Sequence, residues 1–212
     1  MYKRQDLSAG AVAGLKHVKH PINAAYAVKT KSPHVMLSGA GAEEFAKEQG
    51  LEMVEDNMYF ATPKTMEWIE KLKQESKKNG TVGCVVLDKQ GNLTAGTSTG
   101  GMFKKRWGRI GDSPVIGAGT YADNNSCAVS CTGHGEYFIR HAVAFDVCAR
   151  YKYLKESVEK AADYIIHTEL NTNAGNGGLI AVDKLGNIAM PYNSGGMFRG
   201  FLYKEKGSPE IK

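Results

Sequence analysis

The first 80 residues alternate short apolar runs with longer amphipathic segments, a pattern typical of mixed α/β structure. Small and apolar residues alternate over 10–18, which predicts a strand, and a second brief strand is predicted at 34–37. Helices are predicted at 21–31, with proline near the first turn, at 42–49 and at 63–78. The last helix ends in lysines followed by Asn-Gly, which is a solvated stop.

From residue 81 the pattern changes to short β-branched runs joined by glycines, and an internal repeat becomes visible. The segments 86–93 and 181–188 match without a gap, and each is followed by a similar glycine-rich loop, at 98–104 and 193–199. Each copy is predicted to be a β-hairpin, because two apolar runs flank an Asp-Lys-x-Gly-Asn turn.

Two further helices, at 135–152 and 157–170, are predicted to cover these hairpins. The expected architecture is therefore helices packed on antiparallel sheets, a sandwich of the α+β class. No Pro/Ser-rich linker and no break in composition divides the 212 residues, so we expect a single domain over 1–212.

Composition and charge exclude several classes of protein. The chain is 42% hydrophobic and 23% charged with a net charge of +5, which is globular composition. Because no apolar run reaches the ~18 residues of a membrane helix and no signal peptide is recognisable, we expect a cytoplasmic protein without a membrane partner. Scattered lysines without interleaved aromatic residues argue against a nucleic-acid partner. No nucleotide, flavin or catalytic-metal motif is present, so no cofactor is expected.

The cysteines form no CxxC pair, which favours buried thiols over a disulfide framework or a zinc site: Cys84, Cys127, Cys131 and Cys148.

The repeat isolates two threonines that hairpin geometry does not require. The second copy has Asn176 in place of Thr81, and Ser194 in place of Thr99. A threonine that opens a strand is ordinary, since β-branched residues favour strands. If the bond between Gly80 and Thr81 is cut, however, the new α-amine lies beside its own hydroxyl, and a reference pKa of about 7.7 to 8.0 lets it act as the base.

Two further loops offer groups that could bind an amino acid. Arg109 and Asp112 on a glycine-rich loop form either a surface ion pair or a clamp in which the guanidinium binds a carboxylate and the Asp accepts from an ammonium. The segment 131–136 leads from a strand into a helix, where its glycines either make a turn or expose N–H groups to an oxyanion. For His134, a structural role is favoured over a catalytic one.

With these stretches in view, 80–83, 97–102, 108–114 and 131–136, the chain closely resembles the plant-type asparaginase and isoaspartyl peptidase family of N-terminal-nucleophile hydrolases. The resemblance implies an αββα sandwich made as a single precursor. The precursor would cut itself between Gly80 and Thr81 into an α chain, 1–80, and a β chain, 81–212, and would assemble as a dimer of such pairs. The implied substrate is an aspartyl β-amide, either free L-asparagine or an isoaspartyl peptide.

The resemblance also assigns roles by position. Thr81 corresponds to the nucleophile and new N-terminus, and Thr99 to the neighbouring hydroxyl that holds its Oγ. Thr132 and Gly133 correspond to the oxyanion hole. The residues implied to contact substrate are Arg109 at the α-carboxylate, Asp112 at the α-ammonium, and Ile110, Gly111, Thr132, Gly133, His134 and Gly135 around them.

One departure from the family concerns the N-terminal end. Full-length relatives carry a further segment before the residue that matches Leu7, with a core strand, a sodium-binding loop and an asparagine near the nucleophile. We therefore expect the fold to be incomplete there, and we take residues 1–5 as a cloning or assembly scar outside the fold. The alternatives are a glycosylasparaginase, which shares the Arg-x-Gly-Asp loop, and a non-catalytic fragment of the fold. The preferred leaving group and the rate of self-cleavage are left open.

Overall fold

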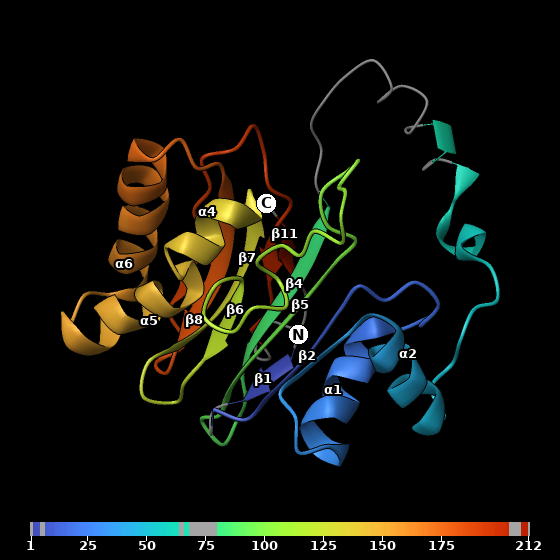
Figure 1. Ribbon diagram of the computed structural model, residues 1–212. Coiled ribbons are helices and arrows are strands. Elements are labelled where there is room, and N and C mark those ends of the chain that lie inside the picture. The colour runs from blue at the N-terminus through green and yellow to red at the C-terminus, as the bar shows by residue number, and fades with distance from the viewer. Residues whose placement is uncertain (1, 5–6, 64–65, 68–79, 204–208, 212) are drawn as a thin grey trace.

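Two β-sheets lie face to face at the centre of the computed structural model, which describes residues 2–4, 7–63, 66–67, 80–203 and 209–211 (Figure 1). The first sheet has the strand order β3-β2-β1-β5-β4 and the second has the order β6-β7-β8-β9. The strands of the first sheet are β1 (Tyr2–Arg4), β2 (Ala9–Ala13), β3 (Met36–Ser38), β4 (Thr81–Leu87) and β5 (Leu93–Thr99). Those of the second are β6 (Thr120–Ala122), β7 (Cys127–Gly133), β8 (Gly177–Asp183) and β9 (Ile188–Ala189). A separate ribbon pairs β10 (Gly200–Phe201) with β11 (Glu210–Ile211).

Helices cover the outer face of each sheet, as Figure 1 shows. On one side lie α1 (Pro21–Lys31) and α2 (Gly39–Glu48), followed by the 3-10 turn η1 (Asn57–Phe60). On the opposite side lie α4 (Gly135–Arg140), α5 (Val143–Tyr153), α6 (Val158–Tyr164) and the π-helix η2 (Ile165–Leu170). The predicted α+β sandwich with layers in the order αββα is confirmed.

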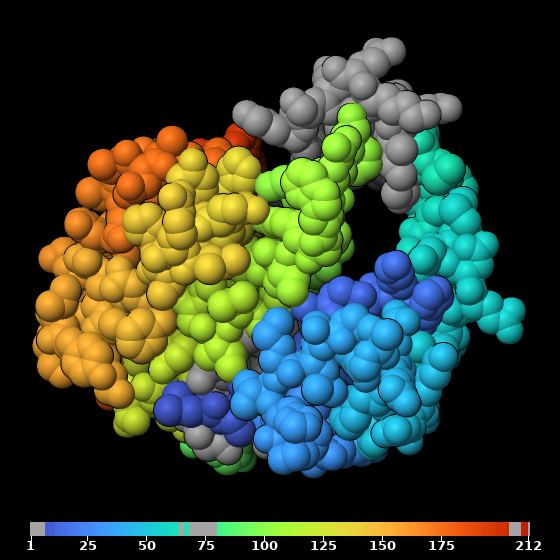
Figure 2. All heavy atoms as spheres, in the orientation of Figure 1, coloured from blue at the N-terminus to red at the C-terminus, as the bar shows by residue number. Residues whose placement is uncertain are grey.

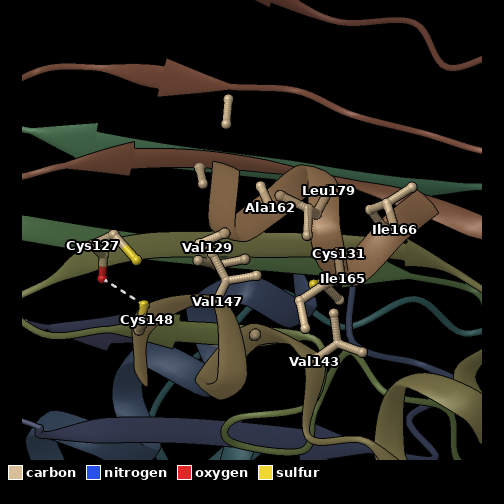
Figure 3. Packing of buried hydrophobic residues seen from close by; sticks show 14 of the residues in the cluster. Cys127, Val129, Cys131, Val143, Val147, Cys148, Ala162, Ile165, Ile166 and Leu179 are labelled. Carbon is tan, nitrogen blue, oxygen red and sulfur yellow. Dashed lines mark hydrogen bonds between the residues drawn. The ribbon is translucent and has the colours of Figure 1, made fainter. Parts of the chain in front are cut away.

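Apolar contacts hold these layers together. Between the sheets, Leu93 and Ala95 of β5 pack with Ala128 and Val182 of the second sheet. A larger cluster joins β7 and β8 to the helices that cover them, and Figure 3 shows its side chains, including Val129, Val147 and Leu179. On the other side a side chain at Gly10 would lie 2.0 Å from the carbonyl oxygen of Ala25, so β2 can approach α1 only with glycine at this point.

The internal repeat forms the two hairpins that were predicted, β4-β5 and β8-β9. Their turns are built alike. Oδ1 of Asp88 accepts from the amide of Asn92 at 2.8 Å, and Oδ1 of Asp183 accepts from the amide of Asn187 at 2.9 Å. In each turn the asparagine side chain also donates to the second carboxylate oxygen of the aspartate, and a glycine adopts positive φ.

The structure corrects the expected strands in two ways. Residues 2–4, which were assigned to a scar outside the fold, form β1 and pair with β2 on one side and with β5 on the other. A polar stretch of this length carries no alternation from which a strand could be predicted. The predicted strand 10–18 ends at Ala13, because Gly14 turns with a φ of +69°. It pairs in parallel with β3, so the first sheet is not purely antiparallel.

Several helices and one thiol also differ from expectation. The predicted helix 135–152 is broken where Ala142 adopts the left-handed conformation, with a φ of +47°, and the segment 157–170 continues from α6 into a π-helix. Most of the predicted helix 63–78 lies outside the described residues. The cysteines are unpaired, and Cys127, Cys131 and Cys148 are buried as expected, but Cys84 is exposed on β4. None of the helices described is long and apolar enough to cross a membrane.

Candidate active site

The candidate residues come together at one end of the sandwich because β5 and β7 run in the same direction. At the start of β5, the amide of Leu93 donates to Oδ1 of Asn124, just before β7 begins, at 2.7 Å. Further along, the hydroxyls of Thr97 and Ser130 share a hydrogen bond of 2.6 Å. The carboxyl ends of both strands therefore lie at the same edge. Figure 2 shows an open gap between the loop after β5, in yellow-green, and the cyan segment after α2.

Thr81 and Thr99 face each other at this edge. They are direct partners in the β4-β5 register, and the Thr81 hydroxyl donates to the Thr99 hydroxyl oxygen at 3.3 Å. The Thr99 hydroxyl in turn donates to the carbonyl oxygen of Gly80 at 2.9 Å and accepts from the amide of Gly101 at 2.9 Å. One hydroxyl thus contacts both the candidate nucleophile and the carbonyl that precedes it, where it could stabilise developing negative charge.

Arg109 is held by a residue that the sequence analysis did not assign to the site. Its Nε and Nη2 atoms donate to the two carboxylate oxygens of Glu136, both at 2.8 Å. These bonds raise the pKa of Arg109 above its ordinary value, against the opposing effect of burial, and they lower the pKa of Glu136. The surface pair expected as one alternative, Arg109 with Asp112, is not the bond that forms. Glu136 fixes the guanidinium instead and leaves its remaining N–H groups for a ligand.

Asp112 lies beside this pair and is 6% exposed. Its Oδ2 atom is buried and has no hydrogen-bond partner among the described residues. Burial raises the pKa of this carboxyl from 3.8 to about 6, and the nearby Arg109 opposes the rise. A side chain at Gly135 would lie 2.9 Å from Arg109 and also from Oδ1 of Asp112, so glycine is needed where the three residues converge. A buried carboxylate oxygen without a partner is suited to accept from a cationic group.

Thr132 and Gly133 end β7 opposite Gly178 and Gly177 of β8. Gly133 has a φ of +149°, and a side chain there would lie 2.4 Å from the carbonyl oxygen of Asn176, so the strands approach closely at this point. The amide of His134 donates to that same carbonyl at 2.9 Å. The imidazole ring lies against Tyr137, with ring centroids 5.7 Å apart. These contacts support the structural interpretation of His134.

Comparison with known proteins places the chain in a family. A family model described as asparaginase matches residues 3–210. The chain belongs to the asparaginase family. The isoaspartyl peptidase of Salmonella typhimurium is 48% identical and covers 93% of this chain and 67% of its own length. That of Escherichia coli is 43% identical, covering 95% and 70%. The isoaspartyl peptidase/L-asparaginase of Homo sapiens is 39% identical, covering 91% and 65%.

In this asparaginase family member the predicted site residues form three groups. The first is Gly80, Thr81 and Thr99, joined by hydrogen bonds. The second is Arg109, Asp112 and Gly135 with the guanidinium lying over Gly111, where a side chain would meet it at 2.7 Å. The third is Thr132 with Gly133 at the end of β7. Ile110 is exposed, and no contact assigns it to the site.

Sequence reasoning missed Glu136 as the partner of Arg109, although it closes the motif 131–136. An acidic residue in the first turn of a helix was the available signal, but that position is also favoured by the helix dipole alone. In the part of the chain that the structure describes, no group of three or more His, Cys, Asp or Glu side chains is arranged to hold a metal.

Proposed function

We propose that this chain hydrolyses the β-amide bond of L-asparagine and of isoaspartyl peptides, using Thr81 as an N-terminal nucleophile. The observation that carries the proposal is the contact of the Thr99 hydroxyl with both the Thr81 hydroxyl and the Gly80 carbonyl. Family membership and the names of the relatives, isoaspartyl peptidase and isoaspartyl peptidase/L-asparaginase, support the same activity. They do not favour glycosylasparaginase.

The first step is self-cleavage. The Thr81 Oγ adds to the carbonyl carbon of Gly80, and the Thr99 hydroxyl stabilises the negative charge on the carbonyl oxygen. The C–N bond then breaks, the proton of the hydroxyl passes to the nitrogen, and an ester links Gly80 to Thr81 Oγ. Water hydrolyses this ester, which gives a carboxylate on Gly80 and a Thr81 with free hydroxyl and α-amine. That amine is the base that the uncut chain lacks.

Turnover repeats this chemistry on the substrate. Arg109 binds the α-carboxylate through the N–H groups that Glu136 leaves, and the partnerless Oδ2 of Asp112 accepts from the α-ammonium. The Thr81 Oγ attacks the β-carbonyl carbon while its amine takes the proton, and the Thr132 hydroxyl with the Gly133 N–H stabilises the oxyanion. The Thr81 ammonium gives the proton to the leaving nitrogen as the C–N bond breaks, so ammonia or an amino acid leaves, and water then hydrolyses the β-aspartyl ester to aspartate.

The test is release of ammonia from L-asparagine and of the free amino acid from a β-aspartyl dipeptide. We expect both reactions with the wild-type chain, loss of both with Thr81→Ala, and partial retention with Thr81→Ser, which keeps a hydroxyl. Equal rates for wild type and Thr81→Ala would contradict the proposal. An activity restricted to glycosylated asparagine would favour the alternative. Assembly as a dimer of self-cleaved pairs and a cytoplasmic location stay predictions from the sequence.

A further inference from the structure

Three buried hydroxyls form a cluster in the interior between the sheets, next to the candidate site. Thr97 of β5, Thr120 of β6 and Ser130 of β7 are each 3% exposed or less. The Thr120 hydroxyl donates to Thr97 Oγ1 at 2.6 Å, and Thr97 and Ser130 share a bond of the same length. Backbone carbonyls complete the cluster, with that of Ser113 at 3.2 Å from Thr120 Oγ1 and that of Gly119 at 3.4 Å from Thr97 Oγ1.

Apolar packing does not require these hydroxyls. The same inter-sheet layer is filled a few residues away by leucine, alanine and valine side chains, among them Leu93 and Ala95 on β5 itself. Burying a hydroxyl costs free energy unless it is hydrogen-bonded, and a hydrogen bond needs its partners in a defined geometry. A cluster of buried hydroxyls therefore restricts how the segments that carry them lie relative to one another. The cluster also packs against β4, the strand that begins with Thr81. A side chain at Gly83 of β4 would lie 2.2 Å from the Ser130 hydroxyl, which therefore occupies its place.

Each hydroxyl belongs to a segment that carries one part of the site. Thr97 precedes Thr99 by two residues, so both point to the same face of β5, and Ser130 precedes Thr132 by two residues on β7. The third segment is the loop that carries Asp112 and leads into Thr120 at the start of β6. The carbonyl of Asp112 accepts from the amide of Gly119 at 3.1 Å, and the carbonyl of Gly119 accepts from the amide of Cys131 at 2.9 Å.

We propose that Thr97, Thr120 and Ser130 are positioning residues that fix three parts of the site relative to one another. These parts are the Thr81–Thr99 pair, the oxyanion donors Thr132 and Gly133, and the ammonium acceptor Asp112. The inference rests on the proposed function for the roles of those parts, but the coupling itself is a property of the hydroxyl cluster. All three side chains are buried, so their role is to position the groups that contact the substrate.

The test replaces hydroxyls without changing volume. Thr97→Val is expected to lower kcat about 10- to 100-fold with little change in KM, since a nucleophile displaced by about 1 Å loses on that scale. Thr120→Val lies nearer the Asp112 loop and is expected to raise KM for L-asparagine. Thr97→Ser restores the hydroxyl and is expected to restore kcat to within about threefold.

Ser126→Ala is the matched control. The Ser126 hydroxyl is fully buried and donates to the carbonyl of Cys148 at 2.7 Å, but it lies at the other end of β7, away from the site. We expect this variant to lower the melting temperature as Thr97→Val does and to leave kcat and KM unchanged. An equal loss of kcat in Ser126→Ala, or a kcat within twofold of wild type in Thr97→Val, would overturn the proposal.

Amide hydrogen exchange separates this inference from the proposed function, because it needs no turnover. Thr97→Val is expected to speed exchange at Gly101 and at Gly119, on two different segments of the site, and Ser126→Ala is expected to speed neither. Wild-type chain without hydrolase activity would contradict the proposed function alone. Unchanged exchange at both glycines in Thr97→Val would overturn the coupling, whatever the activity.

Discussion

Replacing Asp112 with asparagine should make the protein more stable and less active. The carboxyl is almost fully buried, and one of its oxygens has no hydrogen-bond partner among the described residues. Its pKa is raised from 3.8 to about 6, chiefly by burial. Because one pKa unit corresponds to about 1.36 kcal/mol, a rise of about two units corresponds to about 3 kcal/mol of lost stability when the group is charged.

The sign of the pH dependence follows from the same pKa. The folded state binds this proton more tightly than the unfolded state, so the destabilisation is absent below pH about 4 and complete above pH about 6. Asp112→Asn cannot ionise. It should therefore gain up to about 3 kcal/mol over wild type at pH 8, and this gain should shrink as the pH is lowered to 5.

The activity should change in the opposite direction. The neutral asparagine side chain at position 112 cannot offer a charge to the substrate α-ammonium. Loss of a charged hydrogen bond costs about 1.5 to 3 kcal/mol, which corresponds to a fall of roughly 10- to 100-fold in kcat/KM.

The assays are urea unfolding at pH 5 and pH 8 and ammonia release from L-asparagine. Asp163→Asn, on the exposed side of α6, is the matched control and should change stability by less than about 0.5 kcal/mol at either pH. The reasoning would be refuted by an Asp112→Asn variant that is less stable than wild type at pH 8, or by one whose stability difference is the same at both pH values.

Two further changes test other parts of the site. Arg109→Lys keeps the charge but loses the paired bonds to Glu136, so kcat/KM for L-asparagine should fall by the equivalent of about 1.5 to 3 kcal/mol. If the wild-type chain were equally active on L-asparagine and on an analogue without the α-carboxylate, the clamp hypothesis would be wrong. Gly133→Ala places a methyl group 2.4 Å from the Asn176 carbonyl, so the melting temperature should drop and turnover should be lost, as thermal unfolding and the same assay would reveal; wild-type values would show that the strands can separate there.

Features specified by local sequence were predictable. The two hairpins follow from an Asp-x-x-Gly-Asn turn whose hydrogen bonds all lie within a few residues, as in the turns at Asp88 and Asp183. The contact of Thr81 with Thr99 was expected from family resemblance and agrees with their pairing in the register of β4 and β5.

Features that depend on distant partners were not predictable. Glu136 meets Arg109 across 27 residues of sequence, and nothing in either local stretch specifies that pair. Similarly, Thr97 and Ser130 look like ordinary strand residues in the sequence, because the hydrogen bond between their hydroxyls forms only when the two sheets stack. The strand β1 is stabilised only by neighbours on both sides, so its own residues carry no signal of it.

The central claim is that Thr81 becomes an N-terminal nucleophile, and intact-mass spectrometry of the purified chain tests it most directly. After incubation at neutral pH the account predicts two species, with masses of residues 1–80 and 81–212, and an uncut Thr81→Ala chain. A sample quenched during turnover of L-asparagine should carry a β-aspartyl ester on the 81–212 species alone. Hydrolysis of L-asparagine by a chain that stays whole, or by Thr81→Ala, would contradict the account.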